Sequence, residues 1–477
     1  MRPNILFAIA DDASHFSPYG HSFVEMPAAD WVAHNGIRFD NAYTSSPKCA
    51  PSRATILTGR YPWQLEDACN HQCYFPSKFP LYPDLLEEAG YHMGYTGKGW
   101  GPGDYTRYGR TRNPAGNEYN EIKLTPPRDS KIAADDYAAN FEKFLEARPE
   151  GAPFCFWYGC REPHRHYNYG EGIRGGKKME SIEKLPSYWP DDERVKVDLL
   201  DYAYEIEWFD LHLGRMLDTL RRIGELDNTI IVVTSDNGCP FPRVKGQMYE
   251  QDFHLPLLVR YGNGQKGRVV EDLITFSDFA PTFLEAAGVK APAEFSGKSF
   301  WNLITSSDSG RIDPDRKFVF FGREKQDQGR ENDLGYPVRC VCDYDYLYVR
   351  NFAPDRWPAG NPETNYTNCD GSPTKDLILE LEKQGIHFYY NLCFGKREGE
   401  ELYNIRRDPE CLHNLAQEPA CAELKEFYWQ TLKKFLEDMQ DPRIFGNGDI
   451  FESYEYAKKG MHSWAHYVAG DWQPQKY

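Results

Sequence analysis

The sequence has no apolar run long enough to cross a membrane. Its longest hydrophobic segments, such as Asn4–Ala10 and Thr229–Thr234, have the length of β-strands, whereas a membrane-spanning helix needs about 20 consecutive apolar residues. Internal repeats and low-complexity tracts are also missing. We therefore expect a globular protein without a membrane segment.

Positive charge is scarce. The 72 Asp and Glu residues outnumber the 55 Lys and Arg residues, and the formal net charge is −17. The field of such a protein repels nucleic acids and anionic membrane surfaces, so we expect neither as a partner. A local basic pocket could still bind a small anion.

The cysteines do not form a recognisable framework. Twelve of them are spread over 477 residues, and the pairs Cys69/Cys73 and Cys340/Cys342 could each be a disulfide or a metal pair. Because neither pair has further His or Cys residues at ligand spacing, we expect plain thiols.

The chain is expected to carry no signal peptide. It begins Met-Arg-Pro-Asn and runs directly into an apolar, strand-like segment. A chain from which a leader had been removed would look the same. The expected location is therefore periplasmic or extracellular if a leader was removed, and cytoplasmic otherwise.

Strand-like and helix-like segments alternate along the first two thirds of the chain, which is typical of an α/β fold with a mixed, mostly parallel central sheet between helices. Ligands of such sheets bind at the carboxyl ends of the strands. Continuous apolar runs predict buried strands, and amphipathic segments predict helices. The strands are expected at Asn4–Ala10, Phe154–Tyr158, Thr229–Thr234, Leu255–Arg260 and Lys317–Phe321, and the helices at Tyr82–Ala89, Ala133–Ala147, Val195–Ile223 and Phe279–Ala287.

The sequence changes character after about residue 330. Tyr336–Asn351 predicts a hairpin, Ala353–Thr374 is rich in Pro, Asn and Gly and predicts loops, and a helix is expected over Cys421–Met439. We therefore expect a larger domain over residues 1–330 and a smaller one, built on a short antiparallel sheet plus a helix, over residues 331–477.

Residues Cys49–Arg60 read Cys-Ala-Pro-Ser-Arg-Ala-Thr-Ile-Leu-Thr-Gly-Arg. They predict a helix that ends at Gly59, since a proline is tolerated in a first helical turn. Cys49 would then lie at the helix N-terminus, where backbone N–H groups and the helix dipole favour an anion. Arg53 adds a cation one turn later.

Oxygen-bearing side chains end two of the predicted strands. Asp11 and Asp12 follow the first strand, and Asp236 and Asn237 follow the strand that starts near Thr229. Carboxylate and amide oxygens suit Ca²⁺ or Mg²⁺, and the lack of an accompanying histidine argues against zinc. One Asp-Asp pair alone would more often be a cap or a solvated turn, but two such strand ends favour a metal site.

The string C-x-P-S-R followed by L-T-G-R resembles the signature of the type I sulfatases of the alkaline phosphatase superfamily. In that family the cysteine is oxidised to formylglycine, whose hydrated aldehyde is the nucleophile. The resemblance implies an alkaline-phosphatase-like fold with a catalytic larger domain, and either a formylglycine-generating or an anaerobic sulfatase-maturing enzyme as a partner. It also implies bound Ca²⁺, or Mg²⁺, with ligands Asp11, Asp12, modified Cys49, Asp236 and Asn237.

The same resemblance implies the catalytic groups. Lys98 and Lys245 match lysines that bind the sulfate in the family, and Arg53 belongs to the signature itself. His164 follows a predicted strand and matches a histidine that contacts the sulfate and the leaving group, which suits an imidazole near neutral pH. The implied catalytic set is Cys49, Arg53, Lys98, His164 and Lys245.

One position departs from the family pattern. Sulfatases commonly carry a histidine two residues after the active-site lysine, whereas Lys98 is followed by Gly99, Trp100 and Gly101. The family's histidine handles protons on the formylglycine hydroxyls, so that role is vacant or reassigned. We predict that His71, or a contact of Trp100, partly replaces it.

Several segments are most similar to the heparan N-sulfatases, or sulfamidases. The substrate that this resemblance implies is the N-sulfate of glucosamine in heparin or heparan sulfate fragments. We predict that His71, Glu162 and Arg165 bind the substrate, with surface exposure as the alternative for Glu162 and Arg165. Two positions differ from that subgroup, which has Asp at Glu162 and Arg at Lys245. An O-sulfatase acting on a glycosaminoglycan or another sulfated glycan, a phosphonate or phosphodiester hydrolase on the same fold, and a sugar-binding protein with an unmodified cysteine remain alternatives. The similar segments are Tyr43–Ser46, Pro240–Pro242, Tyr336–Arg339, Phe388–Tyr390 and Leu402–Tyr403.

Overall fold

The structure is a computed structural model that describes residues 2–263 and 266–474. Within this part, an eight-stranded sheet has the order β10-β2-β8-β7-β1-β6-β4, with β9 beside β2. β8 runs antiparallel to β7 and β2, and the other recorded pairings are parallel. This confirms the predicted mixed, mostly parallel sheet. Its strands are β1 (Asn4–Ala10), β2 (Ile37–Tyr43), β4 (His92–Gly97), β6 (Phe154–Gly159), β7 (Thr229–Ser235), β8 (His254–Arg260), β9 (Arg268–Val270) and β10 (Ile274–Thr275).

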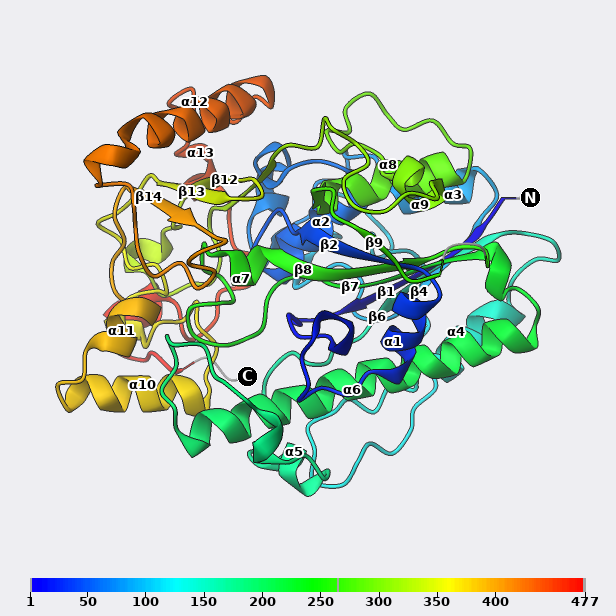
Figure 1. Ribbon diagram of the computed structural model, residues 1–477, viewed down its shortest axis with the longest axis horizontal. Coiled ribbons are helices and arrows are strands. Elements are labelled where there is room, and N and C mark those ends of the chain that lie inside the picture. The colour runs from blue at the N-terminus through cyan, green and yellow to red at the C-terminus, as the bar shows by residue number, and fades with distance from the viewer. Residues whose placement is uncertain (1, 264–265, 475–477) are drawn as a thin grey trace.

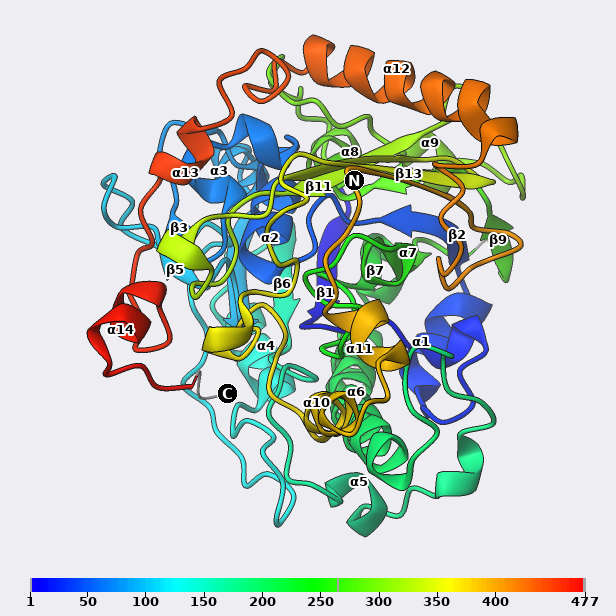
Figure 2. The same cartoon turned by 90° about the vertical axis from the view of Figure 1, so that its left-hand side faces the viewer.

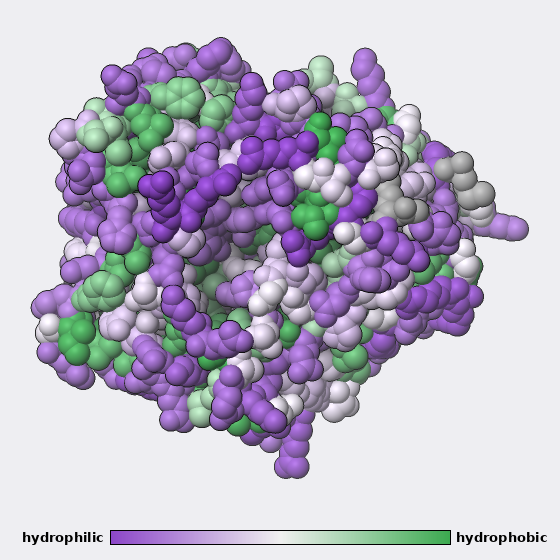
Figure 3. Space-filling view, viewed as in Figure 1, coloured by the Kyte–Doolittle hydropathy of each residue, from purple (hydrophilic) through white to green (hydrophobic). Residues whose placement is uncertain are grey.

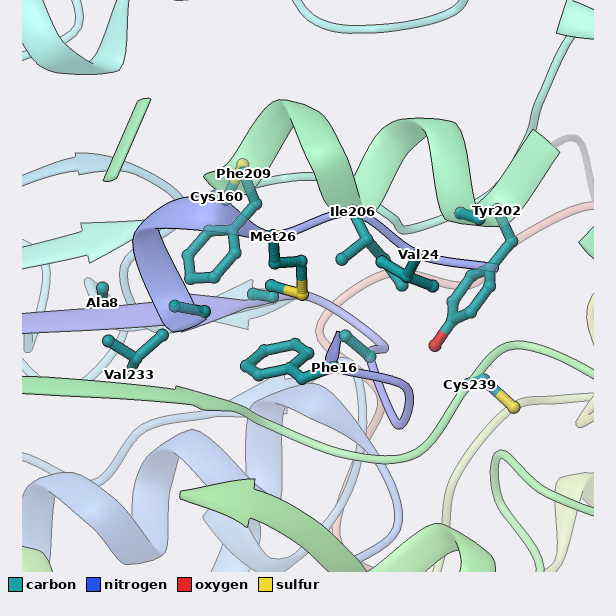
Figure 4. Close-up of a cluster of buried hydrophobic side chains, with 14 of the residues drawn as sticks. Ala8, Phe16, Val24, Met26, Cys160, Tyr202, Ile206, Phe209, Val233 and Cys239 are labelled. Carbon is teal, nitrogen blue, oxygen red and sulfur yellow. The ribbon is translucent and has the colours of Figure 1, made fainter. Parts of the chain in front are cut away.

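Helices cover both faces of this sheet (Figure 1), because its central strands are apolar on both faces. Along β1, Leu6 and Ala8 face one core, and Ile5 and Phe7 face the other. Figure 4 shows part of the first core, between β1 and α6. The first layer contains α1 (Pro27–His34), α4 (Tyr137–Glu146) and α6 (Glu193–Arg222), and the second contains α2 (Cys49–Thr58), α3 (Tyr82–Glu88), α8 (Phe279–Ala286) and α9 (Trp301–Thr305).

A separate antiparallel sheet has the order β11-β12-β13-β14. Because side chains alternate along a strand, Cys340 of β12 packs in a core with Phe253 beside the main sheet, whereas Val341 packs against α12. Figure 2 shows α12 lying over this sheet, as expected for the smaller unit. The elements are β11 (Val319–Arg323), β12 (Val338–Cys342), β13 (Tyr346–Asn351), β14 (Glu400–Asn404) and α12 (Ala422–Asp438).

Short elements complete the described chain. The two-stranded pair of β3 and β5 is parallel, and the remaining helices span four to eleven residues each. These elements are β3 (Cys73–Tyr74), β5 (Gly103–Asp104), α5 (Glu171–Arg174), α7 (Glu250–Phe253), α10 (Pro373–Lys383), α11 (Phe388–Cys393), α13 (Ile450–Ser453) and α14 (Trp464–Ala469).

One predicted strand lies in a different sheet from the one expected. The run Lys317–Phe321 was placed in the main sheet, but β11 pairs with β12 in the second sheet. An apolar run predicts that a strand is buried but does not predict which strand it pairs with, and this explains the error. The second sheet thus begins before residue 330, and the division into domains 1–330 and 331–477 stays a prediction.

The other coarse expectations agree with the structure. The hairpin, the five predicted helices around α2, α3, α4, α6 and α8, and the late helix α12 are all present. Each of the twelve cysteines is a free thiol. Within residues 2–263 and 266–474, no helix has both the length and the apolar character required to cross a membrane. The face in Figure 3 is mainly hydrophilic, with apolar residues in small scattered patches.

Two glycines allow the ends of β4 and β6 to approach closely. Gly97 and Gly159 are paired in register, and the backbone N–H of Lys98 donates to the Gly159 carbonyl at 2.7 Å. A Cβ on Gly159 would lie 1.8 Å from the Lys98 carbonyl oxygen. The position of Lys98 therefore depends on this close backbone contact.

We expect Gly159→Ala to lower the free energy of unfolding by about 1–3 kcal/mol, because the methyl group would force the two strands apart. Gly214→Ala is the control: its Cβ would meet only Ala28 Cβ, at 3.6 Å, inside α6. That variant should gain about 0.5–1 kcal/mol, since alanine is the better helix former. Urea unfolding measures the free energy of unfolding of each variant. Equal values for the two variants would contradict the packing argument.

Candidate functional site

The four predicted oxygen ligands meet at one edge of the main sheet. β1 and β7 are parallel neighbours with Ala10 opposite Ser235, so the residues that follow them lie side by side. The Asp12 backbone N–H donates to Asp236 Oδ1 at 3.1 Å, and Asn237 Nδ2 donates to Asp12 Oδ1 at 2.8 Å. Asp12 has a φ of 72°, a conformation that is costly for a residue with a side chain.

Cys49 lies against this group as the first residue of α2. Its Sγ and a carboxylate oxygen from each of Asp11 and Asp12 all lie within 4.8 Å of one another. The side chain is buried, and burial raises the pKa of the thiol to about 12, although the charge of Lys98 acts in the opposite direction. A thiol that stays protonated at neutral pH is a poor nucleophile.

Helix α2 is buried along its whole length and is tied to the sheet edge by polar side chains. Ser52 Oγ donates to the Asp236 carbonyl at 2.6 Å. Arg53 donates through Nε to Asp236 Oδ2 at 2.7 Å and through Nη1 to the carbonyl oxygens of Lys98 and Gly99. The fully buried guanidinium thus binds the protein's own carboxylate and backbone, whereas its Nη2 has no hydrogen-bond partner among the described residues, and the catalytic role of Arg53 stays a prediction.

Two lysines pair with the two carboxylates of β1. Lys98 Nζ lies 2.6 Å from Asp11 Oδ2, and Lys245 Nζ lies 2.5 Å from Asp12 Oδ2 and 2.9 Å from Asp370 Oδ2. Burial by itself would raise the pKa of Asp11, but the charges of Lys98 and Arg53 outweigh it and hold that pKa well below its usual value. Asp11 is therefore ionised at any working pH.

His164 follows β6 and is the most exposed of the predicted catalytic side chains, at 34%. Its Nε2 lies 3.9 Å from Asp12 Oδ2, and its Nδ1 lies 2.7 Å from the Arg165 carbonyl oxygen. That hydrogen bond fixes the proton on Nδ1 when the imidazole is neutral. Nε2 is left facing the carboxylates and the cavity.

His71 approaches the cysteine from the segment after α2. Its Nε2 lies 3.6 Å from Cys49 Sγ, and its Nδ1 lies 2.8 Å from Asp327 Oδ1. The other Asp327 oxygen binds Lys48 Nζ at 2.8 Å, and both of these side chains are 2% exposed. Trp100 instead donates Nε1 to the Ala50 carbonyl, so it packs under α2 without a polar group toward Cys49.

A cavity of about 600 Å³ opens beside these groups. Its lining includes Lys48, His71, Lys98, His164 and Lys245, together with Asp11, Asp327 and Asp370. Both cations and carboxylates thus line a space that could take a small anion and the group attached to it.

Glu162 and Arg165 also line this cavity, but their polar atoms bind the protein itself. Glu162 accepts hydrogen bonds from the Ala133 N–H at 2.7 Å and the Tyr137 hydroxyl at 2.8 Å. Arg165 donates to both oxygens of Asp198, at 2.7 and 2.9 Å. These contacts stabilise the cavity wall, and binding of the substrate by Glu162 and Arg165 stays a prediction.

The residues at the sheet edge fit a hard divalent cation. Asn237 Oδ1 is buried and has no hydrogen-bond partner among the described residues, while its Nδ2 is used by Asp12 and the Gly238 carbonyl. The amide is therefore oriented with its oxygen free, as a metal ligand requires. The surrounding ion pairs also contain one more carboxylate than Lys and Arg side chains: Asp11, Asp12, Asp236, Asp327 and Asp370 against Lys48, Arg53, Lys98 and Lys245.

Three site residues were missed from the sequence. Lys48 directly precedes the cysteine motif, and this adjacency is the sequence feature that could have identified it as a site residue. Asp327 and Asp370 come from irregular segments near the second sheet, where no local pattern separates a buried carboxylate from a solvated one. Their part in the site became visible only from the tertiary contacts.

We expect Asp327→Asn to lower the free energy of unfolding by about 3–5 kcal/mol, because it leaves the buried Lys48 ammonium without its counter-charge. Asp438→Asn is the matched control, since Asp438 pairs with Lys434 on the surface of α12 and is 56% exposed. Exposed pairs contribute less than about 1 kcal/mol. Urea titrations compare the two variants, and a loss of similar size in both would refute the buried pair as a stabilising unit.

Comparisons with known proteins indicate the family of this chain. The sequence model of the Sulfatase family matches residues 3–289. The human N-sulphoglucosamine sulphohydrolase is 28% identical over 94% of this chain and 93% of its own length. The N-acetylglucosamine-6-O-sulfatase of Bacteroides thetaiotaomicron is 29% identical over 67% of this chain and 74% of its own length.

A solved structure described as a complex with its substrate D-glucosamine-2-N,6-O-disulfate superimposes with a TM-score of 0.64. It is 21% identical and covers 96% of this chain and 100% of its own. At that identity the match supports the fold. The family match spans more than half of the sequence and includes Cys49, both strand-end pairs and the two lysines, so the chain belongs to the sulfatase family.

Proposed function

We propose that the protein removes sulfate from a sulfated sugar by hydrolysis. The preferred substrate is the N-sulfate of glucosamine in heparin or heparan sulfate fragments. The observation that supports this most strongly is the convergence of Cys49, the acidic strand ends and two lysines at one edge of the sheet. The human relative that matches nearly the whole chain is named for the same reaction. An O-sulfatase is the second candidate, because a comparably similar relative is named for 6-O-desulfation.

The proposal requires that Cys49 is oxidised to formylglycine by a maturation enzyme, since the buried thiol is a poor nucleophile. A hydrated formylglycine would supply the attacking hydroxyl. Position 49 is suited to this because it begins α2, where free backbone N–H groups and the helix dipole stabilise negative charge.

A divalent cation, Ca²⁺ or Mg²⁺, would be held by Asp11, Asp12, Asp236 and Asn237 with the modified residue 49, and would withdraw charge from the sulfate oxygens. Lys98 and Lys245 border the cavity and would bind the other sulfate oxygens as charge builds on them. Arg53 would act indirectly, because it fixes Asp236 and the Lys98 backbone.

His164 is suited to protonate the departing nitrogen or oxygen, since its Nε2 faces the cavity while Nδ1 is held by the Arg165 carbonyl. His71 is suited to take the role of the missing family histidine. The Asp327 carboxylate orients its ring and leaves Nε2 directed at residue 49. The pair would accept a proton from a hydroxyl at that position.

An assay of the matured protein tests the substrate. We expect hydrolysis of N-sulfoglucosamine to exceed that of 6-O- and 2-O-sulfated sugars and of a phenylphosphonate ester. Mass spectrometry of the tryptic peptide Cys49–Arg53 should show the aldehyde, and Cys49→Ala should be inactive. Preference for an O-sulfate would favour the second candidate. An unmodified, inactive Cys49 from the native source would leave only a binding protein.

His71→Ala should lower kcat by about 100-fold or more, because general acid–base groups contribute roughly 10²–10⁴-fold, with a smaller change in KM. Trp100→Phe is the control for the alternative assignment, since it removes only the hydrogen bond to Ala50 and should retain most of the activity. Steady-state kinetics over a range of pH separate the two. Unchanged turnover in His71→Ala would exclude the histidine, and a large loss in Trp100→Phe would assign the role there.

A further inference from the structure

Lys48 is a buried lysine at the cavity that has no part in the proposed reaction. It directly precedes Cys49, and it lines the cavity together with Lys98 and Lys245. Its side chain is 2% exposed, and its Nζ lies 2.8 Å from Asp327 Oδ2. No other hydrogen bond or ion pair of this ammonium group is recorded within residues 2–263 and 266–474. Since an ammonium group has three N–H donors, two of them lack a partner in this part of the chain.

Another buried lysine shows how the protein satisfies such a group by itself. Lys375, in the first turn of α10, is 3% exposed. Its Nζ donates to the backbone carbonyls of Asn365, Tyr366 and Cys369, at 2.8, 3.1 and 2.7 Å, and it does not line the cavity. Burying an ammonium group with unused donors is costly. The unused donors of Lys48 beside a cavity therefore point to a ligand that accepts hydrogen bonds.

The partner of Lys48 connects it to the position of the proposed nucleophile. The other oxygen of Asp327 lies 2.8 Å from His71 Nδ1, and His71 Nε2 lies 3.6 Å from Cys49 Sγ. One carboxylate thus holds both the histidine beside the thiol and the Lys48 ammonium group. Lys48 is separated from residue 49 on this side by a single carboxylate and a single imidazole.

The segment that carries the second proposed sulfate ligand passes on the other side of Lys48. The Gly246 N–H donates to the Pro47 carbonyl at 3.1 Å, and a Cβ on Gly246 would lie 3.1 Å from Lys48 Cε. Gly246 has a φ of 77° and directly follows Lys245. The ammonium group of Lys48 therefore lies between the His71 and Lys245 segments, which both border the cavity.

We propose that Lys48 is a third sulfate-binding lysine, which donates to a sulfate oxygen beside Lys98 and Lys245. This rests on the proposed function, in which the sulfate lies at residue 49. A sulfate has only acceptor atoms and is negatively charged, so it suits donors that the protein leaves unused. A third cation would also stabilise the charge that builds on the sulfate oxygens during the reaction. Asp327 would fix the ammonium group while partly cancelling its charge.

The alternative is that Lys48 and Asp327 form a purely structural ion pair, and the two roles predict opposite results for Asp327→Asn. A structural pair loses its order when either partner is neutralised, so sulfate binding would weaken in variants of both residues. A sulfate-binding lysine loses only a competing counter-charge in Asp327→Asn. Sulfate would then bind more tightly to that variant and more weakly only where Lys48 itself is replaced.

Titration calorimetry of the unmatured protein with inorganic sulfate, at fixed ionic strength and with calcium present, tests this without turnover. Lys48→Met should raise the Kd of sulfate by about tenfold or more, the usual contribution of a hydrogen bond to a charged group. Asp327→Asn should lower the Kd by about twofold or more, because the opposing charge is removed. Arg316→Met is the control: Arg316 pairs with buried Asp278 at 2.6 Å but does not line the cavity, so the Kd should stay within about twofold.

The double variant Lys48→Met/Asp327→Asn guards against a folding defect, because it removes both buried charges and leaves neither unpaired. It should unfold at a higher urea concentration than Lys48→Met and still bind sulfate more weakly than the wild type. An unchanged Kd in Lys48→Met and in the double variant, equal or weaker binding in Asp327→Asn, or a wild type that binds no sulfate would overturn the inference. Failure of the proposed function would appear separately, as a matured enzyme that binds sulfate through Lys48 without hydrolysing any sulfated sugar.

Discussion

The structure depends on charge compensation at the carboxyl edge of the main sheet. Burying a carboxylate costs several kcal/mol unless a partner neutralises it, and here five carboxylates meet four fixed cations in three neighbouring groups of ion pairs. The remaining negative charge and the unpaired oxygen of Asn237 are what a divalent cation would satisfy. Once such an ion is bound, the edge carries a small positive excess, which suits a sulfate.

The backbone makes this concentration of charge possible. Parallel β1 and β7 end side by side, so the residues that follow them are brought together by register alone. The contact of Gly97 with Gly159 then sets the path on which Lys98 leaves β4. Helix α2 is buried on all sides, and a helix in that position can carry Ser52 and Arg53 only because their polar atoms are bound by the sheet edge. Fold and site are therefore not separable here: the polar groups that build the site also anchor the helix that carries Cys49.

The sequence predicts those features of the structure that depend on residues close together along the chain. The strands and helices around the main sheet have clear hydrophobic patterns, so they could be predicted. The positions of four side chains could be predicted as well, because these residues directly follow strands: Asp11, Asp12, Asp236 and Asn237. Asp327 and Asp370 were not, because they come from irregular segments and act through partners more than 120 residues away. The motif predicted Arg53 as a catalytic residue, but helical spacing gives the face on which a side chain lies and could not predict the hydrogen bonds of Arg53 to Asp236 and to the Lys98 backbone. The run Lys317–Phe321 was assigned to the wrong sheet for a related reason. Its apolar residues predict a buried strand but do not predict which strand it pairs with.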